Sequence, residues 1–325
     1  MDKYENKYDL KIFNTLILLI AIALVILYII PLGIDPYSYW FIIKRRVLEA
    51  VAMLVVGTAI AVSSVLFQTI TNNRILTPSI IGFDSLYLMI CSILVLFFHK
   101  LLVSNLVNIH IFFFLTVALM IIFSELLYKF LFIIKENTVY YVLLSGVVFS
   151  LLFRSIYTFF ISIMDVSQYD ALQRKLYASF DLIQYDLLAI NIVIVLLAFN
   201  FVCNMIPDLN VYLIGKDNAK ILGVDTDKVQ IHCMRIISIL VSVSTVLVGP
   251  ITFLGLFAVN IMYILYKTRD HGMFLLGTTF ISWIILFLGA ILVERVFEFD
   301  TNLTVIINGI GGIYFIYLLL KGRIK

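Results

Sequence analysis

Residues 233–266 read CMRIISILVSVSTVLVGPITFLGLFAVNIMYILY and contain a single charged side chain, that of Arg235. The run is longer than the roughly 20 residues that a helix needs to cross the hydrocarbon core of a bilayer. Backbone polar groups find no water in that core, so the run must be helical. Gly249 and Pro250 interrupt it, because proline lacks a backbone donor and disfavours helix at the preceding residue. We expect two short membrane helices, over 233–250 and 253–266, and interrupted segments of this kind often line a cavity.

The rest of the chain has the same apolar character. Of its 325 residues, 63% are hydrophobic and 13% are charged, whereas soluble domains are about 45–50% apolar and about 25% charged. One water-exposed globule of this length has no room for so many apolar side chains. The net charge of +3 is too small and too dispersed to indicate nucleic-acid binding. The composition therefore predicts an all-α polytopic protein of the lipid bilayer, with one transmembrane domain over residues 1–325.

Eight further apolar runs bring the expected number of transmembrane helices to about ten. They cover residues 13–31, 47–67, 79–98, 110–133, 138–163, 186–206, 272–293 and 303–320. Ten spans place both termini on one side, and most Lys and Arg residues fall on that side, so the positive-inside rule predicts cytoplasmic termini. Lys44, Arg45 and Arg46 run against the rule, because they lie outside, just before the second span. Residues 165–185 also lie outside and are expected to form a short surface helix.

A polar stretch over about 208–232 is predicted to lie in the cytoplasm. Gly215 and Gly223 bracket a short helical arm within it. Ala219, Leu222 and Val224 form a partly apolar stripe among charged neighbours. An exposed apolar stripe on a cytoplasmic helix is typical of a surface that binds a partner protein.

The sequence lacks the motifs of nucleotide and metal chemistry. GxxxxGK[ST], HExxH, the nucleophile elbow and the dinucleotide fingerprint do not occur. The four histidines are scattered near predicted helix ends and are interpreted as interfacial residues. We therefore expect a chain that is not an enzyme, holds no metal and binds no cofactor itself.

Arg154 is a charge near the middle of the fifth apolar run, where a charged side chain is costly. We expect it to face a cavity or a partner, either attracting an anionic substrate or pairing with a carboxylate such as Glu125. Small residues predict close packing between helices; among them are Gly57, Gly309, Gly311 and Gly312.

Three stretches carry a family pattern in a fixed order. They are GTAIAVSSVLFQTITNNRILTPSIIGFDS at 57–85, IGKDNAKILGV at 214–224 and VGPITFLGLFAVN at 248–260. Together they resemble the permeases of iron-siderophore and cobalamin ABC importers of type II. The likeness is greatest to the second permease of anguibactin- and petrobactin-type ferric siderophore systems. Val259 and Asn260 depart from the family pattern, which usually has Pro-His there.

The resemblance implies a permease of the cytoplasmic membrane that translocates ferric siderophores of catecholate or carboxylate type. It implies a heterodimer with a second permease, two ABC ATPase subunits that hold the ATP and Mg, and an extracellular or periplasmic siderophore-binding lipoprotein. A haem or cobalamin permease is the alternative within this class. A secondary transporter not driven by ATP is the alternative of another class, although few charged residues lie in the predicted spans.

The resemblance also assigns roles to particular residues. Coupling to the ATPase falls to Gly215, Lys216, Asp217, Ala219, Leu222, Gly223 and Val224. Docking of the binding protein falls to Arg46 and Arg295. The translocation path is lined by Ser150, Arg154, Tyr157 and Thr158. For the basic cluster that ends at Arg46, anchoring of lipid phosphates is the alternative.

Overall fold

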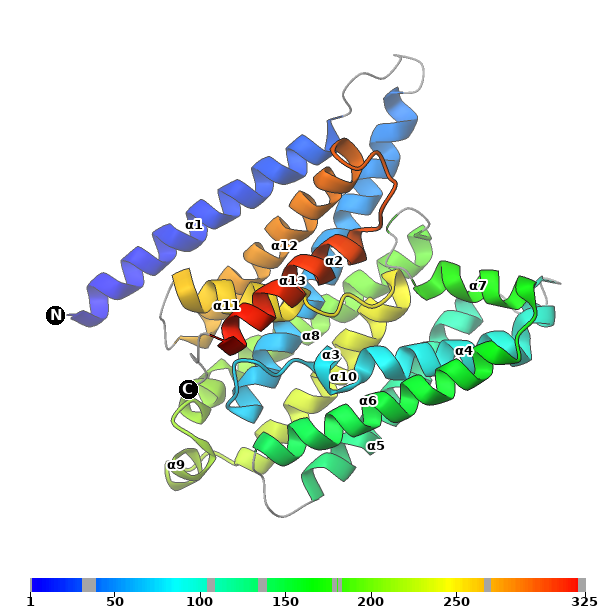
Figure 1. Cartoon of the computed structure of the whole chain (residues 1–325). Helices are drawn as coiled ribbons and strands as arrows, with labels where there is room; N and C mark the ends of the chain where they lie inside the picture. Colours follow the sequence, from blue (N-terminus) through cyan, green and yellow to red (C-terminus); the bar gives the residue numbers. More distant parts are fainter. Residues whose placement is uncertain are drawn as a thin grey trace.

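The computed structural model describes residues 2–30, 39–103, 109–133, 139–176, 180, 183–265 and 270–320, and these residues form helices and no strand (Figure 1). The predicted all-α fold is confirmed. In chain order the helices are α1 (Asp2–Ile29), α2 (Tyr39–Thr71), α3 (Pro78–Ile81), α4 (Phe83–Val103), α5 (Ile109–Ile133), α6 (Val139–Ser162), α7 (Val166–Leu176), α8 (Tyr185–Tyr212), α9 (Lys216–Ile221), α10 (Thr226–Val248), α11 (Leu254–Leu265), α12 (His271–Arg295) and α13 (Leu303–Leu320).

Seven of the described helices are long and apolar enough to cross a membrane: α1, α2, α5, α6, α8, α10 and α12. The apolar parts of α4, α11 and α13 are shorter. Each predicted run coincides with one of these helices, and the number that crosses the bilayer stays a prediction. The short helix expected within residues 165–185 is present as α7.

Some helices begin earlier than predicted, because their first turns consist of polar residues that precede the apolar run. The predicted start of α10 at residue 233 is wrong, because the helix begins at Thr226. Asp225 caps this start by accepting a hydrogen bond from the backbone N–H of Lys228 at 3.1 Å. Apolar runs do not reveal such polar first turns, and α1 likewise begins at Asp2 before its apolar part.

Two interruptions shape the interior of the bundle. Gly82 separates α3 from α4 with a φ of +119°, a left-handed conformation that glycine adopts without strain. The sequence did not predict this break within residues 79–98. Gly249, with a φ of +99°, ends α10, and α11 begins at Leu254, so the predicted break at Gly249-Pro250 is confirmed. Residues of both breaks line one small cavity.

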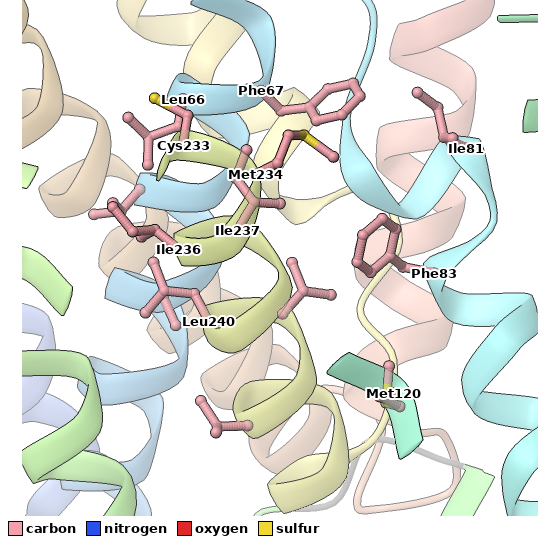
Figure 2. Close-up of a cluster of buried hydrophobic side chains, with 14 of the residues drawn as sticks. Leu66, Phe67, Ile81, Phe83, Met120, Cys233, Met234, Ile236, Ile237 and Leu240 are labelled. Atoms are coloured by element: carbon pink, nitrogen blue, oxygen red, sulfur yellow. The ribbon is translucent and has the colours of Figure 1, made fainter. Parts of the chain in front are cut away.

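The centre of the bundle is built around α2 and α10. Of their most apolar windows, 72% and 67% are buried, compared with 11% for α6. Figure 2 shows part of this core, in which Leu66 and Phe67 of α2, Phe83 of α4 and Ile237 and Leu240 of α10 belong to one buried cluster. The outer helices therefore present apolar faces to lipid or to another protein.

The two ends of the bundle carry different features. The start of α1 and the end of α13 lie toward the end that carries α9, whereas α7 lies toward the other end (Figure 1).

Gly311 provides a test of close helix packing. A Cβ at this residue would lie 2.5 Å from the Cβ of Phe253, whereas one at Gly309 would meet nothing within 4 Å. We expect Gly311→Ala to lower the thermal unfolding midpoint, because overpacking costs about 1–3 kcal/mol. Gly309→Ala on the same helix is the matched control and should not lower it, since alanine favours helix. Equal midpoints for the two purified variants would contradict the packing described here.

Candidate functional site

The first candidate surface is the α9 segment, residues 213–225, at one end of the bundle (Figure 1). Gly215 precedes α9 with a φ of +98° and Gly223 follows it with a φ of +89°. The two left-handed glycines turn the chain sharply before and after α9, which is a short helix of six residues. The predicted helical arm between them is confirmed.

The α9 segment is fixed to the start of α10 by a lysine. The Nζ atom of Lys216 lies 2.9 Å from Asp227 Oδ1 and donates to Gln230 Oε1 at 3.1 Å. At the far end of α9, Asp225 pairs with Lys228 at 2.9 Å, and hydrogen bonds from Lys228 hold the pKa of the Asp225 carboxyl below its usual value. These contacts hold α9 in a defined orientation relative to the bundle.

Apolar side chains of the α9 segment point in two directions. Ala219 is buried, and its carbonyl accepts from Val224 N–H at 3.1 Å. Leu222 is 63% exposed and Ile221 is 83% exposed. The prediction that Ala219, Leu222 and Val224 form one exposed stripe is therefore wrong, because Ala219 is buried. The exposed apolar surface of the segment comes from Ile214, Ile221 and Leu222.

The second candidate surface is a polar cluster at the opposite end, formed by α1, α2 and α12. Arg46 donates to the carbonyl of Tyr28 at 2.8 Å and pairs with Glu294. The side chain of Arg46 is only 12% exposed. Beside it, the Tyr28 hydroxyl donates to Glu49 Oε2 at 2.6 Å, and Arg45 Nε donates to Glu49 Oε1 at 2.8 Å.

The exposed basic side chains of this cluster are Lys44, Arg45 and Arg295, and the exposed acidic residues Glu298 and Asp300 follow α12. Arg295 is exposed and donates to the carbonyl of Leu27 at 3.1 Å. Lys44 is exposed and lies over the ring of Tyr185 at 5.9 Å from its centroid. Of the two residues predicted to dock a binding protein, Arg295 therefore presents its charge to solvent, whereas Arg46 is engaged within the chain.

The third candidate surface is the outer face of α6. Arg154 is exposed there, and no side-chain hydrogen bond or ion pair joins it to another described residue. Thr158 is also exposed and donates to the Arg154 carbonyl at 2.9 Å. Ser150 lies instead toward the bundle, because a Cβ at Gly82 would come 2.8 Å from its Oγ. Tyr157 is partly buried against the core.

The alternative partner expected for Arg154 is engaged elsewhere. Glu125 Oε1 lies 3.9 Å from Arg235 Nε, so the alternative in which Arg154 pairs with Glu125 is wrong. A charged side chain on an outer helix face of a membrane protein requires a cavity or a partner to solvate it. Among the described residues, no side chain pairs with Arg154.

Sequence reasoning missed the acidic members of these sites. Glu294, Glu49 and Tyr28 hold the basic cluster, yet Arg46 and Glu294 are 248 positions apart. Asp84 was also missed, although an acidic residue inside a predicted span is a signal in itself. Among the described residues, no group of three or more His, Cys, Asp or Glu side chains is placed to hold a metal ion.

Comparison with known proteins gives a consistent result. The chain matches the FecCD transport family over residues 11–321. It is 43% identical over 306 residues to the petrobactin import system permease protein YclO of Bacillus subtilis, covering 94% of this chain and 96% of that protein. The permeases FatC and FatD of the petrobactin import system of Bacillus anthracis are 33% and 26% identical, covering 98% and 89% of this chain and 91% and 83% of those proteins.

A solved structure shares the fold. A metal-chelate type ABC transporter in an inward-facing conformation superposes with a TM-score of 0.80 at 21% identity, covering 96% of this chain and 99% of that one. The chain therefore has the same fold as that transporter chain.

Proposed function

This chain belongs to the FecCD transport family, and from that premise we propose that it is one permease subunit of an ATP-driven importer that carries a ferric siderophore into the cell. The observation that carries the proposal is the 43% identity to a petrobactin import permease over nearly the whole chain. The substrate is a ferric chelate of the catecholate or carboxylate type. The chain itself catalyses no reaction.

The partners follow from the three candidate surfaces. A second permease covers outer helix faces such as that of α6, which are apolar and little buried in the single chain. Similarity to two different permeases of one petrobactin system supports a heterodimer. Two ATPase subunits, which hold ATP and Mg, bind the α9 segment. A siderophore-binding lipoprotein docks at the opposite end, on the basic cluster.

The proposed topology is ten crossings of the cytoplasmic membrane with both termini in the cytoplasm. Seven helices long enough to cross and three shorter apolar helices together number ten, and α9 lies toward the same end as the start of α1 and the end of α13 (Figure 1), which supports this topology. The α9 segment then faces the ATPases, and Arg295 faces the binding protein.

Affinity purification from native membranes in mild detergent tests the proposal directly. We expect the chain to bring with it a second permease and a P-loop ATPase. In proteoliposomes, the complex should take up an iron-loaded siderophore only with ATP inside and binding protein outside. Recovery of the chain alone, with uptake driven by an ion gradient instead of ATP, would favour a secondary transporter. Uptake of haem or cobalamin instead of the ferric siderophore would change the substrate and leave the class intact.

Reversal of one exposed charge tests the docking surface. We expect Arg295→Glu to weaken binding of the binding protein roughly two- to fivefold at low salt, because exposed ion pairs contribute about 0.2–1 kcal/mol. The difference should shrink at high salt, where charges are screened. Lys220→Glu, on α9 at the other end, is the control. Unchanged affinity for Arg295→Glu at low salt would refute the docking role.

Arg46 requires a different design, because its side chain is already paired. Arg46→Glu would place two carboxylates together and lower stability as well as docking. The double variant Arg46→Glu with Glu294→Arg restores opposite charges within the cluster. If docking recovers with the double variant, Arg46 acts by holding the cluster together. If docking stays weak while the thermal midpoint recovers, Arg46 contacts the binding protein.

A further inference from the structure

The cavity between the two helix breaks is lined mainly by small and oxygen-bearing side chains. It is about 10 Å³ in volume, enough for about one water-sized occupant. Its polar lining comes from α2, α3, α4, α10 and the α10/α11 break, and consists of Ser63, Ser64, Ser79, Asp84, Ser244, Thr245 and Thr252. Discontinuous helices that meet inside a membrane protein often bind coupling ions.

Asp84 is the one acidic residue in this lining. Its carboxylate accepts hydrogen bonds from the hydroxyls of Thr252 and Ser79. Its Oδ2 atom is shielded from solvent and has no hydrogen-bond partner. No ion pair joins Asp84 to another described residue. A buried carboxylate oxygen without a partner is costly, and it lines a cavity of the size of one small ion.

Burial disfavours the ionised form of Asp84, so a negative charge there requires a positive partner. Two hydroxyls that donate to a carboxylate stabilise its charge. Asp84 also lies in the first turn of α4, where the helix dipole favours an anion. A negative charge on Oδ2 finds no hydrogen-bond donor among the described residues. The negative charge is better balanced by a positive ion in the cavity.

The other walls of the cavity suit a cation as well. Ser244 and Thr245 lie in the last turn of α10, whose carboxyl-terminal end carries partial negative charge. The hydroxyl oxygens of Thr252 and Ser79 keep lone pairs free when they donate their protons to Asp84. Ser64 Oγ closes the site beside Gly255, where a Cβ would lie only 1.9 Å from that oxygen.

We propose that Asp84, with the hydroxyls of Ser79 and Thr252, binds one Na⁺ ion between the α3/α4 and α10/α11 breaks. One carboxylate balances one positive charge. Ca²⁺ takes six to eight oxygen ligands, often several carboxylates, and Mg²⁺ usually keeps several waters, for which this cavity has no room. The bound ion joins the two breaks, so its occupancy stabilises their present packing. The inference does not depend on the transported substrate.

Thermal unfolding of the purified chain in detergent tests the site. NaCl replaces choline chloride at constant ionic strength and constant pH. We expect a saturable rise of about 2 °C or more in the unfolding midpoint, because a ligand that binds only the folded state stabilises it. Asp84→Asn should abolish the rise. Asp186→Asn is the matched control, because Asp186 also lies in a first helical turn but its side chain is 81% exposed.

A second measurement keeps the proposal falsifiable if Asp84→Asn does not fold. Equilibrium binding of radioactive Na⁺ to the unaltered chain should saturate at about one ion per chain, and Thr252→Val should weaken it. A wild-type midpoint that is insensitive to Na⁺ would overturn the proposal. So would a midpoint that responds to pH alone through Asp84, because the carboxyl would then be protonated. An equal response to choline and Na⁺ would indicate ionic strength only.

Discussion

Replacement of Leu222 by aspartate is expected to abolish both ATP-driven uptake and stimulation of the ATPase by this permease. Leu222 is 63% exposed on the α9 segment, so its side chain contributes little to the packing of this chain. An interface core filled by a leucine side chain excludes water, so a buried carboxylate there would lack a partner and cost several kcal/mol. A loss of that size weakens the affinity between the permease and the ATPase by at least about a hundredfold. The measurement is ATP hydrolysis by the reconstituted complex with and without loaded binding protein.

Two controls separate coupling from folding. Val166→Asp introduces the same charge at a 79% exposed apolar residue on α7, toward the other end of the bundle, and should leave ATPase stimulation unchanged. Leu222→Met conserves apolar volume and should retain most activity. Full stimulation in Leu222→Asp, with normal assembly, would exclude the α9 segment as the coupling surface.

Replacement of Arg154 by alanine is expected to reduce uptake of the ferric siderophore tenfold or more. Its guanidinium lies on the outer face of α6 with no partner among the described side chains. In the assembled importer that face is proposed to border the path, where a positive charge attracts an anionic chelate. A loss of about 1.4 kcal/mol of favourable interaction corresponds to a factor of ten. Initial uptake rates in proteoliposomes measure the effect.

A second substitution separates the effect of the positive charge of Arg154 from the effect of its side-chain shape. Arg154→Lys keeps the positive charge and should retain much of the uptake that Arg154→Ala loses. Arg174→Ala removes an exposed arginine from α7 and is the matched control. Co-purification of the second permease must be measured in parallel. Normal uptake by Arg154→Ala would refute the substrate role, and loss of the second permease would assign Arg154 to the subunit interface.

Apolar runs were sufficient to predict which segments are helical, because each span must satisfy its own backbone in lipid. The Gly249-Pro250 break could also be predicted, because proline lacks a backbone N–H and interrupts a helix wherever it occurs. The break at Gly82 was not visible, because a lone glycine is tolerated inside many helices and only the backbone conformation distinguishes them. The polar start of α10 was missed because its stability comes from the Asp225 cap.

The candidate sites were predictable as segments and not as contacts. Gly215 and Gly223 marked α9 correctly because turn residues act locally. The pairing of Arg46 with Glu294 depends on two helices far apart in the sequence, so no local pattern reveals it. The inward direction of Ser150 is set by the close approach of α6 to Gly82, which is a property of packing. Arg154 was identified because a charged side chain within an apolar run is energetically costly. The sequence did not identify its partner.

The attachment of α1 to α12 has a consequence for biosynthesis. The Asn14 amide donates to the carbonyl of Met273, and Arg295 donates to the carbonyl of Leu27. These contacts join α1 to residues made 259 and 268 positions later in the chain. At about 5–20 residues per second, α1 waits roughly 13–50 s for its partner. During that interval Asn14 has no Met273 carbonyl to bind, so a chain that stops before α12 leaves the Asn14 amide without this acceptor.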